Sequence, residues 1–143
     1  MNPKKILIVD KLNSSKLVIK ELYRLGYEPI DFFAQKFVPK KNNFFDKLCN
    51  LYYRNILNNT KYYEEKFHKE LNIFCKINLL EIKKSYPEIS YGLFFSPEWL
   101  SEEVLSISRG ICKKMISYHY DGLFSRNEKM RIYKNYFDDI YSF

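Results

Sequence analysis

Short apolar runs alternate with helix-like stretches along this chain, and this alternation is the feature that most restricts the fold. Helix-start signals or helical spacing of apolar residues separate the runs. Such alternation indicates a parallel sheet with helices on both faces and right-handed crossovers. We therefore expect an α/β, Rossmann-like three-layer α/β/α fold with a five-stranded, mostly parallel sheet in the order 2-1-3-4-5. The predicted strands are residues 6–10 (ILIVD), 27–34 (YEPIDFFA), 89–96 (ISYGLFFS), 112–120 (CKKMISYHY) and 139–143 (DIYSF).

Three sets of capping signals place the shorter helices. Any of the polar residues 13–15 can cap a first helix, which Gly26 is expected to end. Ser96 and Pro97 have the preferred order of an N-cap followed by proline in the first turn, so we predict one helix from there to Gly110. The capping box S-x-x-E at 125–128 predicts a helix that runs to about residue 137.

A helical excursion at 43–85 interrupts the alternation inside what we expect to be a single domain, residues 1–143. Two helices are predicted, separated near 58–60, with Thr60 as the cap of the second. An aromatic stripe at helical spacing usually packs on a sheet, and this is what we expect of the first of these helices. Their apolar positions are Phe44, Leu48, Leu51 and Tyr52, followed by Tyr63, Phe67, Leu71 and Phe74.

The basic charge of the chain is concentrated in the same region. The formal net charge is +7, and residues 36–84 contain eleven Lys or Arg against five Asp or Glu. An excess of this size favours an anionic partner, which could be nucleic acid, phosphorylated small molecules or an acidic membrane. No nucleic-acid-binding motif accompanies the charge, so nucleic acid is not favoured. Lysines and aromatic rings on one helix could instead lie on an anionic bilayer, an alternative to packing on the sheet.

The sequence predicts neither a cofactor nor a metal site. The loop after the first strand, DKLNSS, has no glycine, and a dinucleotide fingerprint or a P-loop needs glycines there. Cys49, Cys75 and Cys112 are far apart and have no nearby histidine pair, so we expect buried thiols in a reducing cytoplasm. The apolar run near the N-terminus is too short for a signal peptide or a membrane span, which favours a cytoplasmic protein.

The candidate site lies where the strand order reverses, between strands 1 and 3. Ligands of open α/β sheets bind beyond the carboxyl ends of the strands at such a point. Two residues at the end of the fourth strand are candidate general bases, because His119 and Asp121 are two positions apart and can face one cleft. The expected substrate-binding residues of the other two loops are Asp10, Asn13, Ser14, Ser96 and Glu98.

Each of these residues also has a structural interpretation. The structural interpretation of His119 and Asp121 is a rim histidine and a turn-forming Asp-Gly. Asp10 could hydrogen-bond a sugar or could cap the following helix. Glu98, at the predicted start of a helix, fits an interaction with the helix dipole.

Several segments, taken in order, resemble a known family. They are KKILIVD, LYRLGYEPIDFFA, NNFFDKL, LFFSPEWLSEEVL and YFDDIYSF. Together they are similar to the N-terminal half of bacterial capsule and lipopolysaccharide biosynthesis proteins, which are glycosyltransferase-like and of GT-B type. That group carries Lys-Gly after strand 3 and Trp-Asp-Ser at the end of strand 4. Here Phe95-Ser96 and Tyr120-Asp121-Gly122 stand in those places, so only Asp121 carries over.

The resemblance implies an acceptor-side domain that works on a carbohydrate or lipid-linked acceptor at the inner face of the cytoplasmic membrane. The nucleotide-sugar donor would bind a second, C-terminal Rossmann-like domain, so we expect a truncated chain that is inactive alone. The alternative is a stand-alone, non-enzymatic Rossmann-like module that docks a partner protein, or an inactive truncated reading frame.

Overall fold

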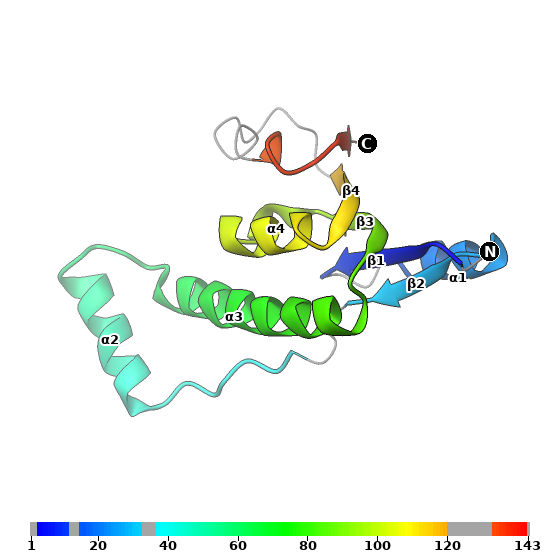
Figure 1. Cartoon of the computed structure of the whole chain (residues 1–143). Helices are drawn as coiled ribbons and strands as arrows, with labels where there is room; N and C mark the ends of the chain where they lie inside the picture. The colour runs from blue at the N-terminus through cyan, green and yellow to red at the C-terminus, as the bar shows by residue number, and fades with distance from the viewer. Residues whose placement is uncertain (1–2, 12–14, 33–36, 120–132, 143) are drawn as a thin grey trace.

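A computed structural model describes residues 3–11, 15–32, 37–119 and 133–142 of the chain (Figure 1). From β1 to β4, strands and helices alternate as the sequence predicts. The elements are β1 (Lys5–Asp10), α1 (Lys16–Arg24), β2 (Glu28–Asp31), α2 (Phe44–Asn55), α3 (Tyr62–Ser85), β3 (Ile89–Phe95), the 3-10 turn η2 (Pro97–Trp99), α4 (Glu102–Arg109), β4 (Cys112–His119) and β5 (Asp139–Ser142).

All five strands are parallel and their order is 2-1-3-4-5, which confirms the predicted topology. β1, the strand next to β2, also pairs with β3, and Ile8 lies opposite Leu93 there. Parallel neighbours require crossover connections, which α1, α2 with α3, and α4 provide for the strands from β1 to β4.

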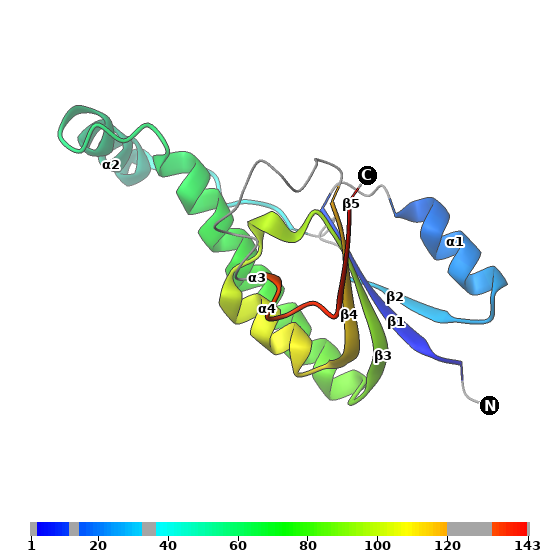
Figure 2. The same ribbon diagram turned by 90° about the horizontal axis from the view of Figure 1, so that it is seen from above.

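The helices cover the two faces of the sheet unequally (Figure 2). α3 and α4 lie on one face, where the larger core cluster contains Leu7, Phe94 and Met115 from the strands. α1 lies on the other face, over a smaller cluster that includes Ile6 and Ile8. Successive strand residues point to opposite faces, so β1 contributes alternately to both clusters.

Some predicted boundaries are wrong. The helix expected from Ser96 to Gly110 is the turn η2 followed by a separate helix, because Ser96 adopts a left-handed conformation (φ 44°) and Ser101 caps α4 instead. Lys61 rather than Thr60 stands at the N-cap of α3. β2 covers only Glu28–Asp31 of the predicted 27–34. The helix predicted from 125 falls largely outside the described residues.

The expectation that the α2 apolar stripe packs on the sheet is also wrong. α2 lies at the far end of α3, away from the strands in both views (Figures 1 and 2). Its apolar positions Phe44, Leu48, Leu51 and Tyr52 are all exposed. The α3 stripe does reach the core, where Leu71 is buried and Phe67 and Phe74 pack against it, while Tyr63 stays outside it.

Among the described glycines, Gly92 has the least room for a side chain. A Cβ added there would lie 2.7 Å from Cε2 of Phe94 and 2.9 Å from Sγ of Cys112. We predict that Gly92→Ala lowers the free energy of unfolding by about 1–3 kcal/mol, because overpacking forces these side chains out of position. Urea unfolding measures the change.

The matched control is Gly110→Ala. Gly110 has an ordinary φ of −74°, and the nearest atom to an added Cβ is a carbonyl oxygen at 3.4 Å. Its stability should change by less than about 0.5 kcal/mol. Equal losses at both glycines would contradict the packing at Gly92.

Asp138 joins β5 to the rest of the sheet. Its carboxylate accepts bonds from Nη1 (2.5 Å) and Nη2 (3.0 Å) of Arg109 and from the backbone N–H of Met115 (2.7 Å). The Arg109 guanidinium, followed by the Met115 N–H, lowers the pKa of the Asp138 carboxyl.

Because the pKa of Asp138 is lowered in the folded state, its ionised carboxylate stabilises the fold. This stabilisation is complete above the ordinary pKa of aspartate, about 4, and is lost as the pH falls through the pKa of the folded state. We predict that Asp138→Asn costs about 1 kcal/mol at pH 7, since the pair is partly exposed, and less at pH 3. Urea unfolding at both pH values tests this. Asp139→Asn, which affects only the neighbouring pair with Lys114, is the control, and a pH-independent loss in Asp138→Asn would contradict the assignment.

Candidate functional site

The carboxyl ends of β1, β3 and β4 meet at one edge of the sheet. Asp10, the last residue of β1, pairs with Phe95, and Phe95 pairs with Tyr118 of β4. The predicted site residues at the ends of these strands therefore lie along a common edge, as the predicted strand order requires.

Asp10 is buried and serves the connection to α1. Its side chain is in step with Ile6 and Ile8, so it faces the α1 side of the sheet. One carboxylate oxygen accepts a 2.6 Å bond from the backbone N–H of Ser15, the residue before α1. This geometry supports the capping interpretation of Asp10. Asn13 and Ser14 lie outside the described residues.

Glu98 and His119 form the central contact of the edge. Oε1 of Glu98 lies 2.5 Å from Nδ1 of His119, and Nε2 of the same ring lies 3.2 Å from Oγ of Ser117. The three side chains thus form a hydrogen-bonded chain from the η2 turn to the middle of β4. Glu98 lies in the three-residue turn η2 and not in the first turn of α4, which begins at Glu102.

The three hydrogen-bonded side chains Glu98, His119 and Ser117 differ sharply in burial. The side chain of His119 is 3% exposed and that of Glu98 is 20% exposed, while Ser117 is fully buried. The expected rim position of His119 is therefore wrong: the imidazole is enclosed, with a partner at each ring nitrogen. Glu98 is the member of the chain that solvent reaches most easily.

The turn that carries Glu98 is fixed from two sides by residues that the sequence analysis missed. Asn72 of α3 donates to the carbonyl of Trp99 (3.1 Å) and accepts from the N–H of Ser101 (2.6 Å). The hydroxyl of Tyr133 donates to the carbonyl of Pro97 (3.3 Å). The sequence did offer a signal for Asn72. It is a polar residue close to the core positions Leu71 and Cys75, and a partly buried polar side chain needs hydrogen-bond partners.

Ser96 starts this turn. Its backbone N–H donates to the carbonyl of Tyr118 (2.7 Å), which extends the β3–β4 pairing by one residue before the chain bends. The left-handed conformation of Ser96 then directs the chain away from the sheet. Ser96 therefore shapes the turn through its backbone.

A lysine and two aromatic rings lie next to this turn. Nζ of Lys11, just after β1, is 5.2 Å from the ring centroid of Phe67 and 5.9 Å from that of Trp99. Both distances are within the range of cation–π attraction. Lys11, Trp99 and Glu98 place a cation, an indole and a carboxylate at neighbouring positions of the edge. These groups suit a polar ligand with hydroxyl groups or negative charge.

The sequence-predicted residues divide between the two faces of the sheet. Asp10 lies on the α1 side, whereas His119 is in step with Met115 and faces the α3 and α4 side, where its ring lies 6.4 Å from that of Tyr133. The structure therefore brings Glu98 and His119 together and does not bring Asp10 to them. Asp121 lies outside the described residues.

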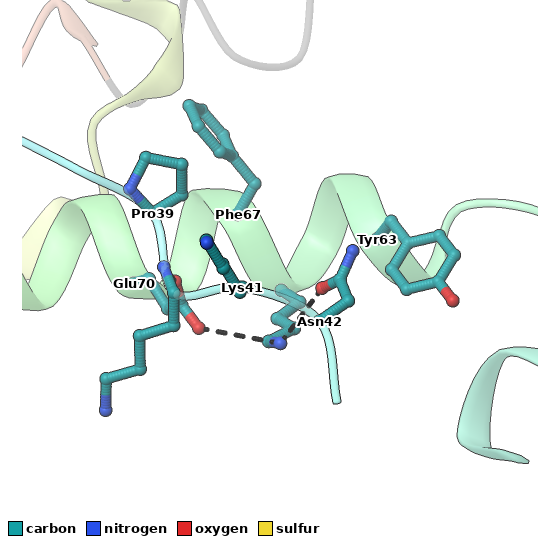
Figure 3. A pocket seen from close by; sticks show the side chains of 8 residues that line it. Pro39, Lys41, Asn42, Tyr63, Phe67 and Glu70 are labelled. Atoms are coloured by element: carbon teal, nitrogen blue, oxygen red, sulfur yellow. Dashed lines mark hydrogen bonds and ion pairs between the residues drawn. The ribbon is translucent and has the colours of Figure 1, made fainter. Parts of the chain in front are cut away.

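A hollow lies between residues 39–42 and α3 (Figure 3), and Phe67, which Lys11 approaches, is one of its lining residues. Its volume is about 330 Å³. Nζ of Lys66 inside it binds Oδ1 of Asn42 (3.1 Å) and lies 3.8 Å from Oε1 of Glu70. The remaining lining residues are Pro39, Lys40, Lys41 and Tyr63.

The thiols are protonated at neutral pH where they are buried. Burial raises the pKa of Cys75 and of Cys112 to about 12. The expectation of buried thiols is confirmed for these two and is wrong for Cys49, which is half-exposed.

Across residues 3–11, 15–32, 37–119 and 133–142, no group of three His, Cys, Asp or Glu side chains is arranged to hold a metal. No helix in these same ranges has the length and apolar character needed to span a membrane. Comparisons with protein-family models, curated proteins and solved structures found no match.

The buried imidazole gives a direct test of the hydrogen-bonded chain. We predict that His119→Ala lowers the free energy of unfolding by about 2–4 kcal/mol, because it leaves a cavity and two groups without their partner. Glu98→Gln should cost about 1 kcal/mol, since an amide oxygen can still accept from Nδ1. Urea unfolding compares the two, and a neutral His119→Ala would contradict the enclosed position of the ring.

Proposed function

We propose that this chain is the acceptor-side domain of a glycosyltransferase-like protein of capsular polysaccharide or lipopolysaccharide biosynthesis, and that it works at the inner face of the cytoplasmic membrane. The observation that carries the proposal is the Glu98–His119 hydrogen bond at the carboxyl edge, with Trp99 and Lys11 beside it. The sequence resemblance and the strand order support it.

Transfer of a sugar requires a base for the acceptor hydroxyl. The hydroxyl oxygen attacks the anomeric carbon, the bond from that carbon to the nucleoside diphosphate breaks, and the hydroxyl proton passes to the base. Glu98 is the accessible carboxylate, and His119 holds it in place through Nδ1. Asp121 remains a second candidate base. The donor would bind a further domain outside these 143 residues.

The side chains at this edge can recognise a sugar. Aromatic rings present an apolar surface to sugar C–H groups, while a carboxylate accepts bonds from sugar hydroxyls. Lys11 would attract the phosphate of a lipid-linked acceptor. The substrate-binding role therefore falls to Lys11, Glu98 and Trp99, and Asp10 takes the structural role.

A second candidate function, a non-enzymatic module that docks a partner protein, is favoured by one observation. His119 is enclosed with both ring nitrogens engaged, as in a purely structural histidine. In this case the Glu98–His119 pair would only fix the η2 turn.

The chain has a built-in reporter for the first function, because Trp99 is its single tryptophan. We predict that acceptor-type oligosaccharides change the Trp99 fluorescence saturably in the millimolar range, and that Glu98→Ala weakens this response at least about fivefold by removing a hydrogen-bond acceptor. Nucleotide-sugars should bind weakly or not at all, as calorimetry measures.

The control is Glu102→Ala, which removes an exposed carboxylate of α4 that lies outside the η2 turn. Its response to the oligosaccharides should equal that of the unchanged chain. A micromolar dissociation constant for a UDP-sugar, or the absence of any response across an oligosaccharide panel, would overturn the proposal. The second outcome would favour the docking module.

A further inference from the structure

α2 presents an apolar face that no described part of the chain covers. Phe44, Leu48 and Leu51 follow the i, i+4, i+7 spacing of one helix face, and 75%, 50% and 57% of their surfaces are exposed. Phe45 and Tyr52 beside them are exposed as well. Five large apolar side chains on a twelve-residue helix form a continuous surface, whereas single exposed apolar residues would be ordinary.

The contacts of α2 with α3 hold this face outward. Asp46, on the opposite side of α2, binds Nζ of Lys66 (2.7 Å) and the hydroxyl of Tyr62 (3.2 Å). The ring of Tyr53 packs edge-on against Tyr62, with a centroid distance of 5.1 Å. Asn43 and Asp46 also form a reciprocal capping box, which fixes the start of the helix.

The same contacts remove negative charge from the exposed surface. Asp46 is the only acidic residue of α2, and it is buried against Lys66. The Lys66 ammonium lowers the pKa of the Asp46 carboxyl, so this pair stays ionised and internally neutral. The charged residues of α2 that remain are Lys47 and Arg54, and both are cationic. Lys40 and Lys41 add further positive charge immediately before the helix.

We propose that α2 lies in the interface of an anionic bilayer, with Phe44, Leu48 and Leu51 among the acyl chains and Lys47 and Arg54 at the lipid phosphates. Interfacial helices combine these two features, and anionic lipids attract basic residues next to the membrane. Lys40 and Lys41, in the segment that leads into α2, line the hollow against α3, and this hollow can receive a lipid headgroup (Figure 3).

Charge favours a lipid surface over the other occupants of such a face. A second copy of this chain would bring Lys47 and Arg54 against the same cations of its partner. An acidic partner protein would also complement Lys47 and Arg54, and failure to bind anionic vesicles would leave it as the alternative occupant. The inference deepens the proposed membrane location, and it does not rest on the transferase chemistry.

The test is sedimentation of the whole chain with vesicles. We expect binding to vesicles that contain phosphatidylglycerol, little binding to pure phosphatidylcholine, and loss of binding at high salt. Leu48→Gln/Leu51→Gln and, separately, Lys47→Gln/Arg54→Gln should each weaken binding at least about tenfold. Both pairs are exposed, so urea unfolding should show nearly unchanged stability.

The matched control is Ile73→Gln/Ile77→Gln, two equally exposed aliphatic residues on α3 (51% and 54%). Vesicle binding of this variant should equal that of the unchanged chain. The inference is wrong if anionic vesicles do not bind, if the control pair loses binding equally, or if the α2 pairs instead abolish a dimer seen by analytical ultracentrifugation. Oligosaccharide binding is scored separately through Trp99, so failure of one proposal is distinguishable from failure of the other.

Discussion

The parallel register of β1, β3 and β4 is the constraint on which the rest of the structure depends. It brings Asp10, Phe95 and Tyr118 to one edge and sets which side chains face each layer of helices. Successive side chains of a strand face opposite sides of the sheet, so Asp10 faces α1 and His119 faces α3 and α4. The two candidate residues therefore share an edge but not a cleft, and each takes a different role.

The side of the edge that faces α3 and α4 carries the chemistry, and its geometry rests on polar contacts between elements far apart in sequence. Asn72 and Tyr133 hold the η2 turn, and the turn holds Glu98 against His119. Polar contacts also orient α2 at the N-terminal end of α3, where Lys66 and Tyr62 bind Asp46. One long helix thus positions both the candidate site and the proposed membrane surface.

Much of the fold could be predicted from the sequence because strand runs and crossovers are local patterns. The strand order was inferred from the single strand and the long helical excursion between strands 1 and 3, and β5 was inferred from its apolar and aromatic residues. The helix start at Ser96-Pro97 was wrong because Ser101 offered a competing cap that local rules could not rank. The exposure of α2 was missed because helical spacing shows which residues share a face and not what that face meets.

The site was predicted in part for the same reason. Strand ends identified Glu98 and His119 individually, but their contact depends on how η2 bends back over β4. The Ser117–His119 contact is more local, since residues two apart on a strand share a face, and that pattern was open to sequence reasoning. Asn72 acts through tertiary contacts 27 and 29 residues away, which no local pattern encodes.

The most direct test of the account is an NMR measurement of the His119 ring nitrogens in the intact chain. A hydrogen bond to the Glu98 carboxylate requires a proton on Nδ1, whatever the state of Nε2. The account predicts a protonated Nδ1 that exchanges slowly with water and changes its signal in Glu98→Gln. An Nδ1 without a proton, or one that is insensitive to Glu98, would contradict the pair at the centre of the proposed site.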